Sequence, residues 1–147
     1  MNNAPNFASI LDEVVTEVAR PKPAPVGTYI CVVGQFDDTT QKRGDNAPFG
    51  QFPLRPISAL EDVDQEELNE SGGLDGKTFY RSFWANEIYK LDEFFEHCGL
   101  DLSKPASRRA RIAEVTNSQV LVVIKHVPRK NDDSIIDAQV ARTAPAE

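Results

Sequence analysis

The chain has 147 residues, a formal net charge of −7 and only two cysteines. This length predicts one domain whose core is large enough to fold without disulfides or a structural metal. Neither Cys31 nor Cys98 belongs to a Cys-x-x-Cys pair, so we expect two reduced, buried thiols and no metal or other cofactor. No segment has the pattern of a signal peptide or a membrane span, which favours a cytoplasmic protein without membrane contact.

The first residues have the periodicity of an amphipathic helix. Apolar side chains recur at spacings of three and four over residues 7–19, and they are Phe7, Ile10, Leu11, Val14, Val15 and Val18. Alternating prolines from Pro21 to Pro25 forbid a helix there and favour an extended strap. Residues 1–25 are therefore predicted to form a helical appendage. It covers one end of the main domain, or it docks on another protein or on a second subunit. Docking on a second subunit would make the protein a homo-oligomer.

Two strands are expected next. Gly27–Phe36 is rich in β-branched and aromatic residues and predicts a long first strand, with Gly34 at a bulge or bend. Phe49–Leu60 predicts a second strand that is irregular or at a sheet edge, because Pro53 and Pro56 cannot donate ladder hydrogen bonds.

The loop between these strands, residues 37–48, is polar and carries Lys42 and Arg43 at its tip. In oligonucleotide-binding barrels a loop at this place closes over the ligand. An ordinary hairpin loop is the alternative.

Residues 61–75 are acidic and contain no Lys or Arg. The seven acids are Glu61, Asp62, Asp64, Glu66, Glu67, Glu70 and Asp75. The remaining 16 acids (23 minus 7) balance the 16 Lys and Arg, so the rest of the chain is neutral. A short helix is expected from Asp64, closed by Gly72 and Gly73.

At residues 77–99 a strand pattern changes into a helical one. Lys77–Ala85 alternates two sets of side chains, as a strand with one buried face does. Asn86 then stands where a helix N-cap belongs, and Gly99 stands where the helix should end.

Two assignments of the exposed face of this strand are open. Arg81 should not be buried unpaired, which favours Phe79, Arg81 and Phe83 as the exposed set. In the competing assignment Phe79 and Phe83 belong to the core, Arg81 snorkels out, and Tyr80 and Trp84 form the binding face.

The C-terminal part predicts further strands. Ser107–Glu114 forms a short basic helix or stays irregular, and Gln119–Val127 is a continuous apolar strand expected to be buried on both faces. Ile135–Val140, or a little beyond, forms the last strand, and Thr143–Glu147 is a disordered tail. One helix between the third and fourth strands predicts a mainly β, five-stranded OB-fold-like barrel over residues 26–142.

Aromatic and basic residues on the strands of such a barrel indicate single-stranded nucleic acid. Bases stack on flat rings while Lys or Arg follow the phosphates, with little sequence preference. The candidate binding residues are Lys42, Arg43, Lys77, Phe79, Tyr80, Arg81, Phe83, Trp84, Lys125, Arg129 and Lys130. For any single aromatic residue among them, a place in the core is the competing interpretation.

Several short segments resemble a family of small tailed-phage proteins found among replication and recombination genes. They are residues 7–12 (FASILD), 20–23 (RPKP), 25–29 (PVGTY), 83–87 (FWANE) and 97–101 (HCGLD). The resemblance implies an OB-fold and a role like that of a phage single-stranded DNA-binding protein in the host cytoplasm, with replication or recombination proteins as partners. Many such proteins end in an acidic, aromatic-tipped tail, whereas Ala141–Glu147 has one acid.

No pattern of catalytic residues is found, so we expect no enzyme. The leading hypothesis is a non-enzymatic single-stranded DNA-binding protein. The alternative is an acidic interaction module that mimics DNA or inhibits a host protein, which the net charge favours.

Overall fold

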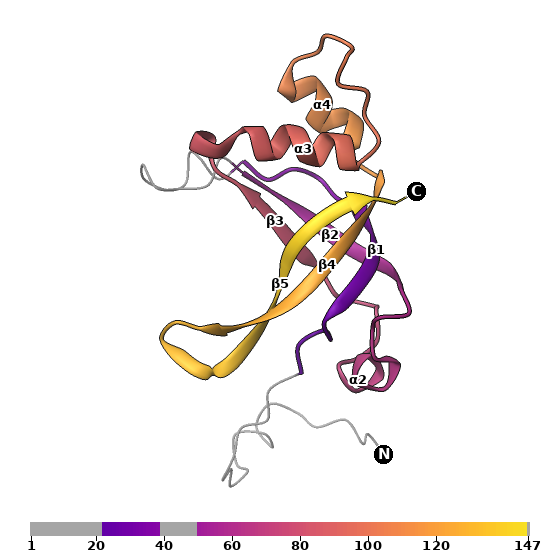
Figure 1. The fold of residues 1–147 in the computed structure, drawn as a ribbon, viewed down its shortest axis with the longest axis vertical. Coiled ribbons are helices and arrows are strands. Elements are labelled where there is room, and N and C mark those ends of the chain that lie inside the picture. Colours follow the sequence, from indigo (N-terminus) through magenta and orange to yellow (C-terminus); the bar gives the residue numbers. More distant parts are fainter. Residues whose placement is uncertain (1–21, 39–49, 147) are drawn as a thin grey trace, which may run out of the picture.

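The computed structural model describes residues 22–38 and 50–146 (Figure 1). Its elements are β1 (Gly27–Val33), β2 (Gly50–Ala59), α2 (Gln65–Glu70), β3 (Phe79–Phe83), a 3-10 turn η1 (Ala85–Glu87), α3 (Tyr89–His97), α4 (Arg108–Val115), β4 (Gln119–Arg129) and β5 (Asp132–Pro145). The predicted N-terminal helix and the loop residues Lys42 and Arg43 lie outside the described residues. No helix of the described part is long and apolar enough to cross a membrane.

The five strands form one antiparallel sheet in the order β3-β2-β1-β4-β5. The two outermost strands, β3 and β5, contact each other, so the sheet curls into a nearly closed barrel (Figure 1). Among the described residues no backbone ladder joins β3 to β5, and this side of the barrel is called the seam below. The architecture is mainly β, with α3 and α4 between β3 and β4, and is consistent with the predicted OB-fold-like barrel.

The core fills the barrel and extends to the two ends that helices cover. Phe94 of α3 packs against Phe52 and Phe83, with ring centroids 5.0 and 5.4 Å away. At the opposite end Leu68 of α2 and the preceding Val63 are buried. Each such side chain contributes about 1.5–3 kcal/mol through its removal from water, so these residues fix α3 and α2 over the barrel ends.

The helix starts follow the sequence in part. Asp64 caps α2 as predicted, because its carboxylate accepts a hydrogen bond from the Glu67 amide at 3.1 Å. Asn86 does not cap α3. It lies inside η1, and α3 begins two residues later than predicted, after Ile88, without a side-chain cap.

The second strand was predicted to be irregular or at an edge, and it is irregular but not at an edge. β2 is paired on both sides, with β1 and with β3. Pro53 is tolerated in this paired strand because its carbonyl oxygen still accepts a hydrogen bond, from the Gly34 amide at 2.7 Å. At Pro56 the register with β1 shifts, between Ile30 and Cys31, which is the irregularity that the prolines indicated.

The fourth strand is buried on one face, whereas both faces were expected to be buried. Val120, Val122 and Ile124 of β4 point into the core, but Leu121 and Val123 between them are only half-buried. The continuous apolar run therefore places apolar side chains on the outside of the barrel as well.

The last strand extends further than predicted. Thr143 pairs with Val122, and β5 continues to Pro145, so the expected disordered tail from Thr143 and the domain end at residue 142 are wrong. The long β4–β5 ladder explains this, because it extends past the apolar part of β5.

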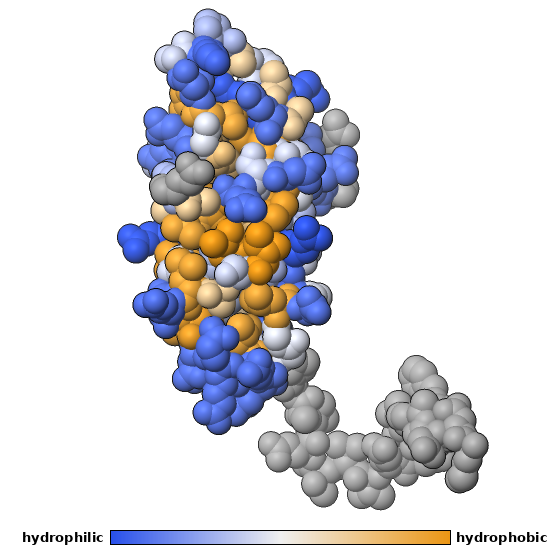
Figure 2. Space-filling model, turned by 90° about the vertical axis from the view of Figure 1, so that its right-hand side faces the viewer, coloured by the Kyte–Doolittle hydropathy of each residue, from blue (hydrophilic) through white to orange (hydrophobic). Residues whose placement is uncertain are grey.

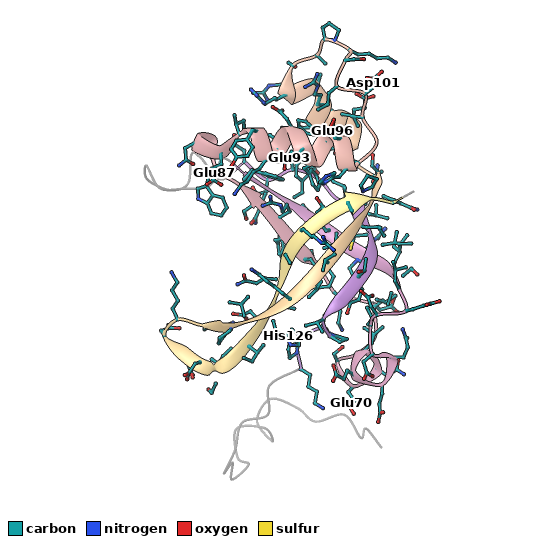
Figure 3. The ribbon with its side chains drawn as sticks, viewed as in Figure 1. Glu70, Glu87, Glu93, Glu96, Asp101 and His126 are labelled. Atoms are coloured by element: carbon teal, nitrogen blue, oxygen red, sulfur yellow. The ribbon has the colours of Figure 1, made fainter. Side chains whose placement is uncertain are left out.

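The end of the proline-rich strap packs on the barrel instead of standing apart. Ala24 and Pro25 are buried, and the Tyr29 hydroxyl donates a hydrogen bond to the Pro25 carbonyl at 2.7 Å. Nε2 of His126 lies 2.7 Å from the Ala24 carbonyl oxygen, and Figure 3 shows His126 where the strap meets β4. The packed unit thus begins before residue 26.

Candidate nucleic-acid interface

A groove follows the seam along β5. Its middle section, of about 570 Å³, lies between β3 and β5. A second section, of about 490 Å³, continues toward the β4–β5 turn and shares Asp137 and Ala138 with the first. A third, of about 260 Å³, continues toward α3 and shares Arg81. The groove therefore runs from Ser134 to Thr143, about 30 Å at roughly 3.3 Å per strand residue.

Two exposed aromatic side chains line the middle section. Tyr80 is 55% exposed and Trp84 is 42% exposed. Phe79 and Phe83, from the alternate positions of the strand, are 5% and 1% exposed and belong to the core. The expectation of an exposed Phe79, Arg81 and Phe83 set is wrong, and neither phenylalanine is available for stacking on a base. The burial in the competing assignment is confirmed, with Phe79 and Phe83 in the core and Tyr80 and Trp84 exposed.

Arg81 shares its side of β3 with the buried Phe79 and Phe83, but its side chain is only half-buried and lines the groove. Its Cζ lies 4.5 Å from the centroid of the Phe83 ring, and Nη1 donates to the Ser82 carbonyl at 2.8 Å. Partial burial lowers the pKa of the guanidinium, while Glu93 and Glu87 act in the opposite direction. An arginine remains cationic despite such a shift. Arg81 therefore supplies a positive charge where the middle and third sections of the groove meet.

Lys77 has a different role from the phosphate contact that the sequence indicated. Its Nζ donates to the carbonyls of Ser71 and Gly73, at 2.9 and 2.5 Å, just past the end of α2. Burial lowers the pKa of this ammonium group. Lys77 thus holds the turn after α2, and it does not line the groove.

The three remaining basic candidates lie on β4 and the β4–β5 turn. Arg129 lines the second section and forms a two-point ion pair with Asp137, with distances of 2.8 Å (Nε–Oδ2) and 3.1 Å (Nη2–Oδ1). These hydrogen bonds lower the pKa of Asp137 and raise that of Arg129. Lys125 and Lys130 are exposed but line no section of the groove.

Three further groups near α3 complete the groove. Lys90, His97 and Arg142 line the third section together with Arg81. Nδ1 of His97 lies 2.8 Å from Oγ1 of Thr143, which connects α3 to β5. Sequence reasoning missed these residues, because their proximity depends on how α3 packs on β5 and no local pattern encodes it.

The lining of the groove is more basic than the chain as a whole. Its Lys and Arg residues are Lys22, Arg81, Lys90, Arg129 and Arg142, and its carboxylates are Glu93 and Asp137. Figure 3 shows Glu93 on α3, between Glu87 and Glu96. Lys22 pairs with Glu70, and Lys90 pairs with Glu87. Such exposed pairs contribute about 0–1 kcal/mol, so a phosphate group can compete for these cations.

The acidic segment serves the fold at several positions. The Asp62 carboxylate accepts from the amide and the hydroxyl of Thr28, at 2.9 and 2.7 Å, and these bonds lower the pKa of Asp62. Asp64 caps α2, and Glu70 pairs with Lys22. Part of this negative charge is therefore used to hold α2 and the strap in place.

Among residues 22–38 and 50–146 no group of three or more His, Cys, Asp and Glu side chains is placed to hold a metal ion. No protein-family model matches the chain, and no curated protein matches it.

Proposed function

We propose that the chain is a non-enzymatic single-stranded DNA-binding protein with an OB-fold, which holds the strand in the groove along the seam. The observation that carries the proposal is the presence of two exposed rings and an arginine, Tyr80, Trp84 and Arg81, in one groove. The sheet order and the helix between the third and fourth strands support the OB-fold.

Binding would use the chemistry that single strands offer. Bases stack on Tyr80 and Trp84, at about 1–3 kcal/mol per stacked base, while Arg81, Lys90 and Arg142 attract phosphates. A groove of about 30 Å accommodates several nucleotides, within the range of about 4–16 known for one OB-fold. Stacking is tolerant of base identity, so sequence specificity is low.

The resemblance to tailed-phage proteins supports a role in phage replication or recombination. Phage replication or recombination proteins would then be its partners, and the host cytoplasm its location. The net charge of −7 opposes non-specific DNA binding, so the affinity depends on the cations gathered in the groove.

Fluorescence anisotropy of a labelled oligo-dT and of a matched duplex, each at low and moderate salt, tests the proposal. We expect the full chain to bind the single strand alone, with an affinity that falls as salt rises because bound cations are released. Replacement of Tyr80 and Trp84 by alanine should abolish most of this binding.

Absence of binding to either probe at micromolar protein and low salt would overturn the proposal. It would favour the alternative, an acidic module that mimics DNA or docks on a basic protein. Equal binding to the duplex and the single strand would also contradict a site built on stacking.

A further inference from the structure

The groove ends in its third section, where β5 passes α3. With about 260 Å³ this section is the smallest of the three. Nδ1 of His97 on α3 lies 2.8 Å from Oγ1 of Thr143 on β5, so the helix and the strand meet at this end. The ring of Phe94, which is buried in the core, also lines the section. A single strand that follows the seam therefore meets α3 here.

Cations from three different elements converge on the third section. They are Arg81 of β3, Lys90 of α3 and Arg142 of β5. Glu93 is the one carboxylate among the described residues of the lining, so three cations and one carboxylate give it a formal charge of +2. Glu87 raises the pKa of Lys90, whereas the nearby charge of Arg81 acts in the opposite direction. An anion between Arg81 and Lys90 would offset this repulsion.

The surfaces beyond the third section do not attract a phosphate backbone. Figure 3 shows Glu87, Glu93 and Glu96 along α3, so a strand that crossed the helix would bring its phosphates toward carboxylates. Figure 2 shows apolar residues gathered over the middle of the side of the barrel that carries β1. A charged backbone gains little from an apolar surface. These surroundings favour the end of a strand in the third section over a strand that passes through it.

We propose that the third section binds the terminal phosphate of a DNA strand. The inference rests on the proposed single-strand binding and names the part of the strand that this section holds. A terminal phosphomonoester carries a charge of about −1.5 to −2 at pH 7, whereas each internal phosphodiester carries a single negative charge. The formal charge of +2 in the lining therefore matches a strand end better than an internal phosphate.

The lining also has the donors that a phosphomonoester needs. A guanidinium group donates two parallel hydrogen bonds to phosphate oxygens, and both Arg81 and Arg142 line the section. His97 uses Nδ1 for its contact with Thr143, which leaves Nε2 as the ring atom that meets a ligand. The volume of about 260 Å³ holds a phosphate group with several waters, at about 30 Å³ per water.

Three short oligo-dT probes of about eight nucleotides, within the range bound by one OB-fold, test the proposal. One carries a 5′-phosphate, one carries a 3′-phosphate, and one has hydroxyl groups at both ends. Each is labelled on an internal base, so that both ends remain free. In anisotropy titrations of the full chain, we expect one phosphorylated probe to bind about 3- to 10-fold more tightly than the hydroxyl probe, because the terminal phosphate adds a charge-assisted contact. The preferred probe identifies which end of the strand lies at α3.

Variants locate the effect in the third section. Lys90→Gln and Arg142→Gln should each bring the affinity ratio of the phosphorylated and hydroxyl probes toward one, even where they weaken all three probes. Lys104→Gln is the matched control, because Lys104 is exposed and lines no section of the groove. Its ratio should equal that of the wild type. Circular dichroism reports that each variant is folded.

A titration of isotope-labelled full chain with mononucleotides does not depend on strand binding. Thymidine 5′-monophosphate or 3′-monophosphate should shift the NMR amide signals of Lys90 and Thr143, whereas thymidine should not.

Two results would overturn the terminal-phosphate site and leave the proposed function intact. One is equal affinity for the three oligo-dT probes. The other is a preference for a phosphorylated probe that persists in both Lys90→Gln and Arg142→Gln, which would place the terminal phosphate elsewhere. Absence of binding to all three probes would instead overturn the proposed function, and the mononucleotide titration would then decide whether the third section binds a phosphomonoester.

Discussion

Arg81 stacks on Phe83, with its Cζ 4.5 Å from the ring centroid, although the two side chains come from the same row of β3. The ring is buried and the guanidinium is only partly so. The phenylalanine thus supports a cation at the edge of the core, where water is partly excluded. A cation held in this way is directed toward the groove at little further cost in side-chain entropy.

Replacement of Arg81 by methionine removes this charge and keeps most of the apolar stem. We expect weaker binding of oligo-dT and a salt slope reduced by about one counterion, with the fold intact by circular dichroism. Arg109→Met on α4, an exposed arginine outside the groove, is the control and should change neither quantity. An unchanged salt slope in the Arg81 variant would exclude a phosphate contact at this position.

Stacking can be tested one ring at a time. Tyr80→Ala and Trp84→Ala should each weaken oligo-dT binding by about 1–3 kcal/mol, roughly 5- to 150-fold. Tyr89→Ala is the matched control, because Tyr89 is 58% exposed and lines no section of the groove. Equal losses in all three variants would point to a general effect of surface aromatic residues and not to a groove. Anisotropy titrations at one salt concentration suffice.

The hydrogen bond from Tyr29 to the Pro25 carbonyl should contribute to stability. Tyr29→Phe leaves that carbonyl without its donor, and we expect the free energy of unfolding in urea to fall by about 1–3 kcal/mol. Tyr80→Phe, at an exposed site, should change it little. Equal unfolding free energies for wild type and the Tyr29 variant would contradict the prediction.

The same tyrosine predicts a loss of stability at high pH. Burial raises the pKa of Tyr29 to about 12, above the value of about 10 for an unfolded chain. The folded state therefore holds this proton more tightly. Its contribution is complete below about pH 10 and disappears as the pH rises toward 12. Urea titrations from pH 8 to 11.5 should show a steeper decline in the wild type than in Tyr29→Phe.

Both thiols should react slowly in the folded protein. Burial raises the pKa of Cys31 and of Cys98 to about 12, which leaves a thiolate fraction of about 10⁻⁴ at pH 8. Iodoacetamide labelling followed by mass spectrometry should show little modification of native protein and complete modification in urea. Cys98 is only partly buried and is therefore the more sensitive test. Rapid labelling of Cys98 without denaturant would contradict the prediction.

Sequence patterns were sufficient where a local signal decides the structure. The alternation in β3, the Asp64 cap and the apolar run of β4 each depend on neighbours in the chain. Asn86 was misassigned as the N-cap because η1 occupies Ala85–Glu87 and α3 begins only after Ile88.

The candidate site was less accessible to sequence reasoning. The alternation in β3 was compatible with either face being exposed. Only the burial of Phe79 and Phe83 in the structure shows that the phenylalanines belong to the core. Arg142 and Lys90 come together through the contact of α3 with β5, which joins distant parts of the chain. The sequence indicated that Lys77 contacts phosphate. Its ammonium group instead donates to backbone carbonyls, which no sequence pattern reveals.

The pairing of β1 with both β2 and β4 has a consequence for biosynthesis. β1 pairs with β2, which follows it directly, and with β4, which is made only after β3, α3 and α4. While the ribosome is still translating, the β1 edge that will meet β4 stays open, and closure waits until the C-terminal hairpin has left the exit tunnel. Nascent chains that stop before β4 should therefore need a chaperone, whereas chains that include the β4–β5 hairpin can close the barrel.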